Sequence, residues 1–196
     1  MDSKTSARSN VGYEGLRDLL EQIEEAGQLL RVDGAEWNLE IGTLEPMIFQ
    51  ELGLYKDSPV VLFENIPGCP EGFRALTGML STARRVARVL GFPETDDVIE
   101  VVQAYRDRMR SDFELTPPQI IETGSVFENI ERDDEVDLMK FPAPYLHEGD
   151  GGRYMGTDDL VIIPDLETDW VNAATYRIQL HDKNTLGIWM SPGKHG

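Results

Sequence analysis

Cysteine and long apolar runs are what this sequence has least of. Cys69 is the only cysteine, so an internal disulfide framework is excluded. Its Pro-Gly-Cys-Pro setting also provides none of the Cys or His spacings that are typical of redox and metal sites. No apolar run approaches the roughly 20 residues that are needed to span a bilayer. The sequence therefore argues against a disulfide scaffold, a cysteine metal site and a membrane protein.

Basic side chains are scarce relative to acidic ones. The 196 residues contain 18 Lys and Arg against 36 Asp and Glu, and the net charge is −18. Nucleic-acid binding needs clustered basic side chains that displace counterions, so a nucleic-acid partner is not expected. An anionic ligand would have to be held by a local basic cluster, because the field of the whole protein repels it.

The amino terminus lacks the features of a secretory signal. Residues 1–12 are mostly polar, with no apolar stretch and no small-residue cleavage site. We expect a disordered tail over 1–12 and a cytoplasmic protein.

Hydrophobic periodicity predicts an α+β fold. The helical pattern covers about 15–26, 39–52, 81–90 and 96–110, and the strand pattern covers 29–32, 59–63, 160–163, 170–176 and 187–190. The composition changes near residue 115, which predicts an amino-terminal α/β domain over 13–115 and a second domain over 116–196. The later strands are separated by turn signals, and they read as successive antiparallel strands of a β-barrel that is not complete.

Three segments could carry chemistry but have structural explanations. Residues 81–85 (STARR) predict a helix start with two exposed arginines. The run 148–152 (EGDGG) lacks the spacing of a phosphate loop and is interpreted as a flexible turn. The carboxylates are scattered, with no pair that spacing assigns to general acid and base roles.

The last forty residues are richer in candidate groups. In a regular strand Asn172 and Tyr176 point to one face and Arg177 to the other, so a bulge or turn near 173–175 would be needed to bring the three together. His195 lies in a turn where it could meet a phosphate or a metal with Lys194 and main-chain amides. A plain surface loop is the alternative interpretation.

Six motifs, in order and in spacing, resemble the UbiD family. They are 141–144 (FPAP), 147–154 (HEGDGGRY), 170–172 (WVN), 176–177 (YR), 181–184 (HDKN) and 191–195 (SPGKH). A weaker resemblance extends upstream, to 16–20 with Gly27 and to 61–68.

The resemblance implies a reversible, non-oxidative decarboxylase that uses prenylated FMN as its electron sink. The substrate would be an aromatic, heteroaromatic or α,β-unsaturated carboxylic acid. The resemblance also implies a fold for the second domain, which would be the beginning of a split β-barrel that binds the flavin. The implied partners are a flavin prenyltransferase, which supplies the cofactor, and further copies of the chain in a homo-oligomer.

The resemblance also assigns residues. Asn172 and His195 would bind Mn²⁺, which bridges to the cofactor phosphate, and K⁺ is a further candidate ion. Arg177 would be catalytic and face the substrate carboxylate. His147 and His181 are interpreted as structural. The cofactor-lining positions would be Thr157, Asn172, Thr175, Tyr176, Arg177, Trp189, Met190, Ser191, Lys194 and His195.

The resemblance covers the front part of a family member, and neither a third metal ligand nor the acidic residues of the catalytic network are recognised. The chain alone is therefore expected to be inactive, because the product carbon needs a proton donor. Three interpretations stay open: the amino-terminal segment of a longer enzyme, one subunit of a split enzyme, and a non-catalytic flavin-binding module.

Overall fold

The computed structural model describes residues 11–52, 58–110, 120–168 and 170–193. The chain divides into two compact units, each built from alternating segments. The first takes Met1–Arg31, Met47–Leu62 and Leu76–Ser125, and the second takes Val32–Pro46, Phe63–Ala75 and Val126–Gly196. The predicted boundary near residue 115 and residues 1–10 of the predicted tail lie outside the described residues. The domain limits therefore stay predictions.

The core of the first unit forms around helix α1 (Leu16–Glu25). Leu19 and Ile23 are one helical turn apart, and they pack with Val60 in a buried cluster. The hydroxyl of Tyr13 donates to the carbonyl oxygen of Val89 at 3.0 Å, which links the start of the described chain to helix α3 (Ala83–Leu90).

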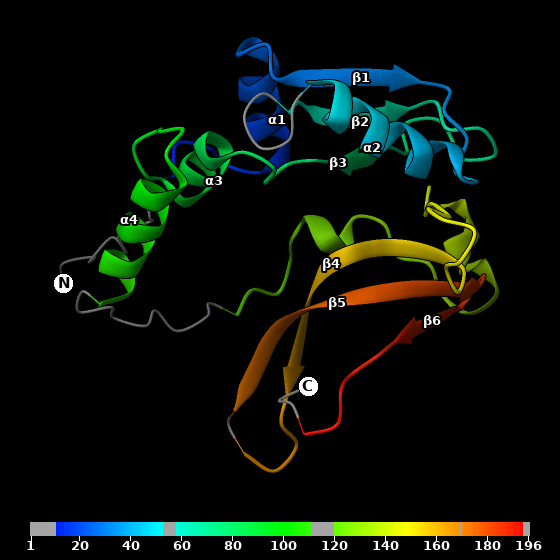
Figure 1. Ribbon diagram of the computed structural model, residues 1–196. Coiled ribbons are helices and arrows are strands. Elements are labelled where there is room, and N and C mark those ends of the chain that lie inside the picture. Colours follow the sequence, from blue (N-terminus) through cyan, green and yellow to red (C-terminus); the bar gives the residue numbers. More distant parts are fainter. Residues whose placement is uncertain (1–10, 53–57, 111–119, 169, 194–196) are drawn as a thin grey trace. The chain divides into compact units, whose positions relative to one another are not determined.

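A three-stranded sheet has the order β1-β2-β3 (Figure 1). Its strands are β1 (Leu29–Asp33), β2 (Val60–Glu64) and β3 (Ala75–Thr77). The central strand β2 is buried along Val60, Val61, Leu62 and Phe63. A continuous apolar run of this kind is typical of a strand that is covered on both faces.

Helix α2 (Glu40–Leu52) contains a tight contact and an internal proline. A Cβ at Gly42 would overlap the backbone of Leu146, so only glycine fits there. Pro46 has no N–H to donate to the carbonyl of Gly42, which interrupts the helical hydrogen bonds at the same turn.

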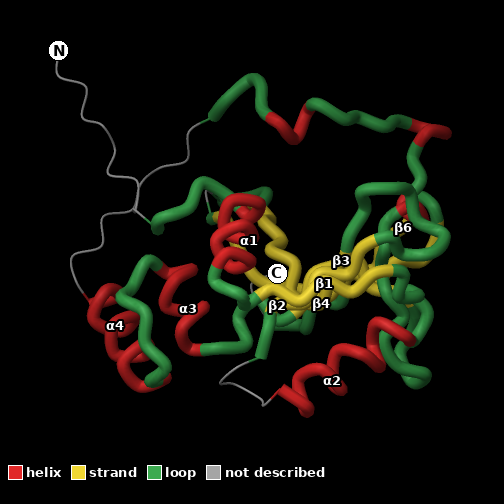
Figure 2. The backbone as a smooth tube through the Cα atoms, turned by 90° about the horizontal axis from the view of Figure 1, so that it is seen from above, coloured by secondary structure: helices red, strands yellow, loops and turns green. Residues whose placement is uncertain are grey.

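Helices α3 (Ala83–Leu90) and α4 (Val98–Arg110) lie side by side in both views (Figures 1 and 2). The Thr82 hydroxyl accepts a hydrogen bond from the Arg85 N–H at 3.3 Å and caps α3, and Gly91 ends the helix with φ 68°. The prediction of two exposed arginines at this start is wrong for one of them, because Arg85 is only 2% exposed. Its side chain turns back onto the preceding loop, whereas Arg84 points outward and pairs with Asp96.

In the second unit, Arg153 connects the motif at 141–144 to a tryptophan. Its Nε donates to the carbonyl of Ala143 at 2.8 Å, and its Nη2 donates to that of Phe141 at 3.1 Å. The guanidinium lies 4.1 Å from the ring centroid of Trp37, a cation–π contact. Burial lowers the pKa of Arg153. Two of the motifs that carry the family resemblance thus hold each other in place.

The second sheet is antiparallel, with the order β4-β5-β6. Its strands are β4 (Arg153–Pro164), β5 (Val171–Asp182) and β6 (Thr185–Ile188), and short 3₁₀ turns at Ser125–Phe127, Asp133–Glu135 and Leu138–Lys140 precede them. The predicted α+β class is confirmed, and this sheet is consistent with part of a barrel. Within the described residues, no helix is long and apolar enough to cross a membrane.

Candidate functional site

Strands β4 and β5 form the hairpin that carries most of the candidate residues. Asp159 pairs with Tyr176, Val161 with Ala174, and Ile163 with Asn172. Directly opposed residues of an antiparallel pair lie on the same face, so Asn172, Tyr176 and Asp159 share one half-buried face. Thr175 and Arg177 alternate with them and lie on the other, exposed face.

The irregularity that brings candidate residues together is in β4, not in β5. Pairing is regular from Val171 to Tyr176, so the bulge considered near 173–175 does not occur. Between Gly156 and Asp159, however, β4 has one more residue than its partner, and Thr157 and Asp158 both stand opposite Arg177. The bulge thus places the candidates Thr157 and Arg177 opposite each other on the two neighbouring strands.

Asp159 is a residue that the sequence reasoning missed. Its Oδ2 is buried and finds no hydrogen-bond partner within the described part of the chain, and burial, with a smaller contribution from Asp158, raises the pKa of its carboxyl. The carboxylate lies over Gly156, where a Cβ would overlap it. The only available signal was a pair of acids inside an otherwise apolar strand, which is a weak one because exposed acids are common throughout this chain.

Asn172 has the second unsatisfied group on this face. Its Nδ2 is buried, and none of the residues that the structure describes accepts a hydrogen bond from it. An amide oxygen is an acceptable ligand for Mn²⁺, and the residue type therefore fits the implied metal. Among the described residues there is no group of three or more His, Cys, Asp or Glu that could hold a metal ion.

The remaining candidates follow β6. Trp189 is 79% exposed, Met190 is half-buried and Ser191 is exposed. Lys194 and His195 lie outside the described residues, so the structure does not test the predicted metal pair. The cofactor and catalytic assignments stay predictions.

The histidines and the glycine-bearing run have local structural contacts. The His147 N–H donates to Asp150 at 3.0 Å and closes a turn, in agreement with the interpretation of 148–152 as a turn. The His181 ring lies over Gly187, which leaves no room for a Cβ there. The His147 hydrogen bond is made by its main chain, while its ring Nδ1 lies 3.4 Å from the same Asp150 carboxylate. These side-chain contacts support structural roles for both histidines.

Comparison with protein families gives two matches that together cover most of the chain. Residues 20–105 match the 3-octaprenyl-4-hydroxybenzoate carboxy-lyase N-terminal domain, and residues 119–196 match the Rift-related domain of the same carboxy-lyase. Both are domains of the UbiD family.

Individual relatives match over nine tenths of the chain. Pyrrole-2-carboxylic acid decarboxylase of Pseudomonas aeruginosa is 32% identical over 91% of this chain and 36% of its own length. The vanillic acid decarboxylase of Sedimentibacter hydroxybenzoicus, solved in an open form with truncated ShVdcD, is 29% identical with a TM-score of 0.73, over 90% of this chain and 37% of that one. HmfF of Pelotomaculum thermopropionicum, solved with prFMN, has a TM-score of 0.73 at 24% identity, over 90% and 38% of the two chains, and shows the fold alone. The chain thus spans little more than a third of the length of these relatives.

Proposed function

The chain belongs to the UbiD family, and from this premise we propose that it is part of a reversible, non-oxidative decarboxylase that works with prenylated FMN. The proposed substrate is an aromatic, heteroaromatic or α,β-unsaturated carboxylic acid. A relative that is called pyrrole-2-carboxylic acid decarboxylase, at 32% identity, supports a heteroaromatic acid within this range.

The observation that carries the proposal is the β4–β5 hairpin. The β4 bulge places Thr157 opposite Arg177 across the strand pair, although the two are far apart in sequence. Asn172 and Tyr176 lie together on one face of β5. A strand pair is a stiffer support for a binding site than a loop, which favours a preorganised site.

Arg177 would hold the substrate. The guanidinium offers two parallel donors to a carboxylate, so it would orient the acid for loss of carbon dioxide. Its position on the exposed face of β5 leaves it accessible to a ligand. When bound, prenylated FMN would supply the electron sink for the carbon that loses carbon dioxide.

Asn172 and His195 would hold the divalent metal, for which we propose Mn²⁺, with K⁺ as a further candidate. The metal would offset the repulsion between the cofactor phosphate and a chain of net charge −18. The other proposed contacts to the flavin are Thr157, Thr175, Tyr176, Trp189, Met190, Ser191 and Lys194.

Two alternatives differ from a single-chain enzyme in how the catalytic site is completed, or whether it is completed at all. In the first, a complementary subunit completes the site, and the presence of a second component, ShVdcD, in the similar vanillic acid decarboxylase favours it. In the second, the chain is a non-catalytic flavin-binding module. A cytoplasmic location, a homo-oligomeric state and cofactor supply by a flavin prenyltransferase stay predictions under all of them.

The decisive experiment begins with the gene beyond the codon for Gly196. The polypeptide that the gene encodes would be produced together with a flavin prenyltransferase and assayed for bound flavin, bound manganese and release of carbon dioxide from a panel of aromatic acids. Turnover by that polypeptide alone supports a single-chain enzyme. Turnover only with a co-purified partner supports a split enzyme, and stoichiometric flavin without turnover supports the binding module. If no flavin is bound under any condition, the proposed function is wrong.

Variants would test the proposed roles of Asn172 and Arg177. Asn172→Ala should lose most of its manganese in elemental analysis, while Asn184→Ala, in the β5–β6 turn of the same sheet, should retain it. Arg177→Lys should keep the metal but lose roughly a hundredfold in kcat/KM, because a lysine cannot form the bidentate pair. Full manganese content in Asn172→Ala would remove that residue from the metal site.

A further inference from the structure

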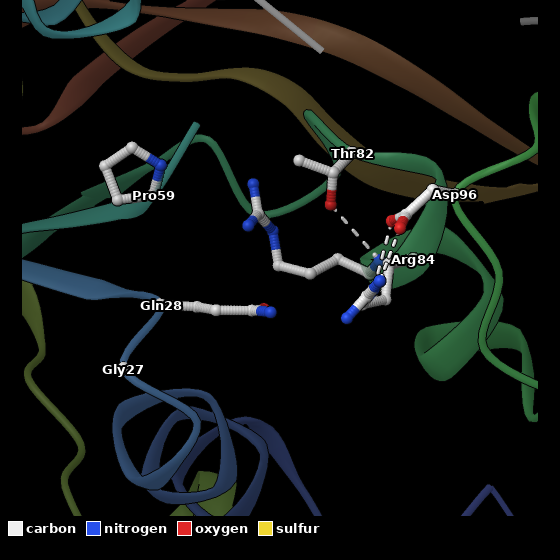
Figure 3. A pocket seen from close by; sticks show the side chains of 7 residues that line it. Gly27, Gln28, Pro59, Thr82, Arg84 and Asp96 are labelled. Carbon is white, nitrogen blue, oxygen red and sulfur yellow. Dashed lines mark hydrogen bonds and ion pairs between the residues drawn. The ribbon is translucent and has the colours of Figure 1, made fainter. Parts of the chain in front are cut away.

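A cavity of about 300 Å³ lies in the first unit, at the start of helix α3 (Figure 3). This volume is enough for a small metabolite. None of its lining residues belongs to the β4–β5 hairpin or to the proposed flavin and substrate site. The side chains that matter are Gln28, Thr82, Arg84, Arg85 and Asp96.

Arg85 contributes a buried positive charge to this cavity. The residue is 2% exposed, and its Nε donates to the carbonyl of Met79 at 3.2 Å. Its Nη2 donates to the carbonyl of Gly78 at 3.1 Å and to the hydroxyl of Ser81 at 2.5 Å. These partners are all uncharged.

The neighbouring arginines are different, because each has an acidic partner. Arg84 pairs with Asp96, and Arg88 pairs with Glu94 at 2.6 Å. Arg85 has no acidic partner among the described residues. A buried charge without a counter-charge is costly, and desolvation lowers the pKa of Arg85 accordingly. An anion in the cavity would supply the missing counter-charge. The Thr82 hydroxyl is already engaged as the cap of helix α3.

Gln28 adds a second unsatisfied group. Its Oε1 is buried and has no hydrogen-bond partner among the described residues. Figure 3 shows its side chain extending toward the side of the cavity where Arg84 and Asp96 pair. A hydroxyl on an occupant of the cavity would satisfy this oxygen.

We propose that this cavity binds a small molecule that carries an anionic oxygen group, phosphate or carboxylate, next to Arg85 and a hydroxyl that donates to Gln28. The pairing of Arg84 with Asp96 removes the repulsion that the Asp96 carboxylate would otherwise exert on the anion. Because the chain has a net charge of −18, such a local arrangement is the only way in which it can attract an anion.

Calorimetric titration of the full chain tests the proposal, with inorganic phosphate, glycerol 3-phosphate and lactate as probes at constant ionic strength. We expect saturable binding of at least one probe, and glycerol 3-phosphate should bind more tightly than phosphate. Preference for lactate over glycerol 3-phosphate would identify the anionic group as a carboxylate, and the reverse order would identify a phosphate.

Variants would test the anion contact of Arg85 and the hydroxyl contact of Gln28 separately. Arg85→Met keeps an unbranched apolar stem but removes the charge, and it should weaken binding at least tenfold. Arg85→Lys should be intermediate. Arg88→Gln, one turn away on the same helix and outside the cavity, is the matched control and should bind like the parent chain. Gln28→Leu should abolish the preference for glycerol 3-phosphate over phosphate.

Two results would overturn the proposal. One is the absence of saturable binding of all three probes to the parent chain. The other is unchanged affinity in Arg85→Lys and Gln28→Leu, which tests the site even if Arg85→Met does not fold. Arg85 and Gln28 lie outside the proposed flavin and substrate site, so the changes expected in their variants do not depend on the proposed decarboxylase function.

Discussion

At the scale of single residues, Arg153 shows how a motif can be explained by structure rather than by catalysis. It makes two hydrogen bonds to main-chain carbonyls and lies against the ring of Trp37. The family-like motifs at 141–144 and 147–154 therefore include at least one residue whose role is to fix the chain.

The first prediction concerns that residue. Arg153→Lys should lower the free energy of unfolding by about 2–3 kcal/mol, because an ammonium group cannot reproduce the planar stack and both donor directions. Urea denaturation would measure the loss. Arg106→Lys, which changes an exposed arginine paired with Asp107, should stay within about 0.5 kcal/mol of the parent chain. Equal stability of the two variants would show that the contacts of Arg153 contribute little.

The second prediction concerns the buried carboxylate of Asp159. Its pKa in the folded state is raised, so the folded chain holds this proton more tightly than the unfolded chain does. Stability must then fall as the pH rises from the unfolded pKa through the folded one, and the penalty stays in place at neutral pH. Asp159→Asn removes the penalty and should raise Tm at pH 7 by on the order of 1 °C, with the difference vanishing near pH 3.5.

Thermal unfolding of the parent chain and Asp159→Asn across this pH range would measure the effect. Glu167→Gln, an exposed acid in the connection after β4, is the control and should give no pH-dependent difference. A stabilising effect of Asp159→Asn that is larger at low pH than at neutral pH would contradict the assigned direction of the pKa shift.

At the scale of helices and strands, periodicity predicted the elements whose apolar residues face a core. The helix predicted over 39–52 is α2, and the end of the third helix at Gly91 is confirmed by its left-handed φ of 68°. Strands β4 and β5 are each 12 residues long and extend well beyond their predicted cores. The parts of the strands that were not predicted contain Gly156, adjacent acids and the polar residues near His181. Such a composition is typical of loops, but cross-strand pairing holds these residues in an extended conformation.

The bulge and the buried groups could not be predicted at this scale. The extra residue in β4 depends on the register with β5, and register is a tertiary property. The burial of Arg85 likewise depends on the path of the loop before α3, where the carbonyls of Gly78 and Met79 meet its guanidinium. The sequence indicated the positions of candidate residues but not which of them face each other.

The third prediction tests the close contact in α2. In an isolated helix Gly→Ala is stabilising by about 1 kcal/mol, yet a Cβ at Gly42 would overlap the backbone of Leu146, which cannot rotate away. Gly42→Ala should therefore lower the free energy of unfolding by about 1–3 kcal/mol in urea denaturation. Gly149→Ala, with nothing within 4 Å of the new Cβ, should be nearly neutral. A stabilised Gly42→Ala variant would show that helix propensity outweighs this contact.

At the scale of the whole molecule, charge is the property that the sequence establishes without a structure. The net charge of −18 arises from 36 acidic and 18 basic residues, so even complete one-to-one pairing would leave half of the acids without a basic partner. Exposed ion pairs such as Arg31–Glu24 contribute little to stability, because solvent screens them. Repulsion among the excess acids should therefore dominate the electrostatic free energy of the folded chain.

The fourth prediction follows from that balance. Raising NaCl from about 0.01 M to 0.1 M shortens the Debye length from about 30 Å to 10 Å, which screens the long-range repulsion more than it weakens close pairs. Tm should rise by about 2–4 °C, which corresponds to about 1 kcal/mol for a chain of this size. Chloride is the appropriate anion, because phosphate would also engage the cavity next to Arg85.

A variant in which the exposed residues Glu128, Glu135 and Glu167 are changed to Gln should show a higher Tm at low salt and a smaller rise in Tm with salt. If Tm instead falls with salt in the parent chain, ion pairs outweigh the repulsion and the acidic excess is not what limits the stability of this fold.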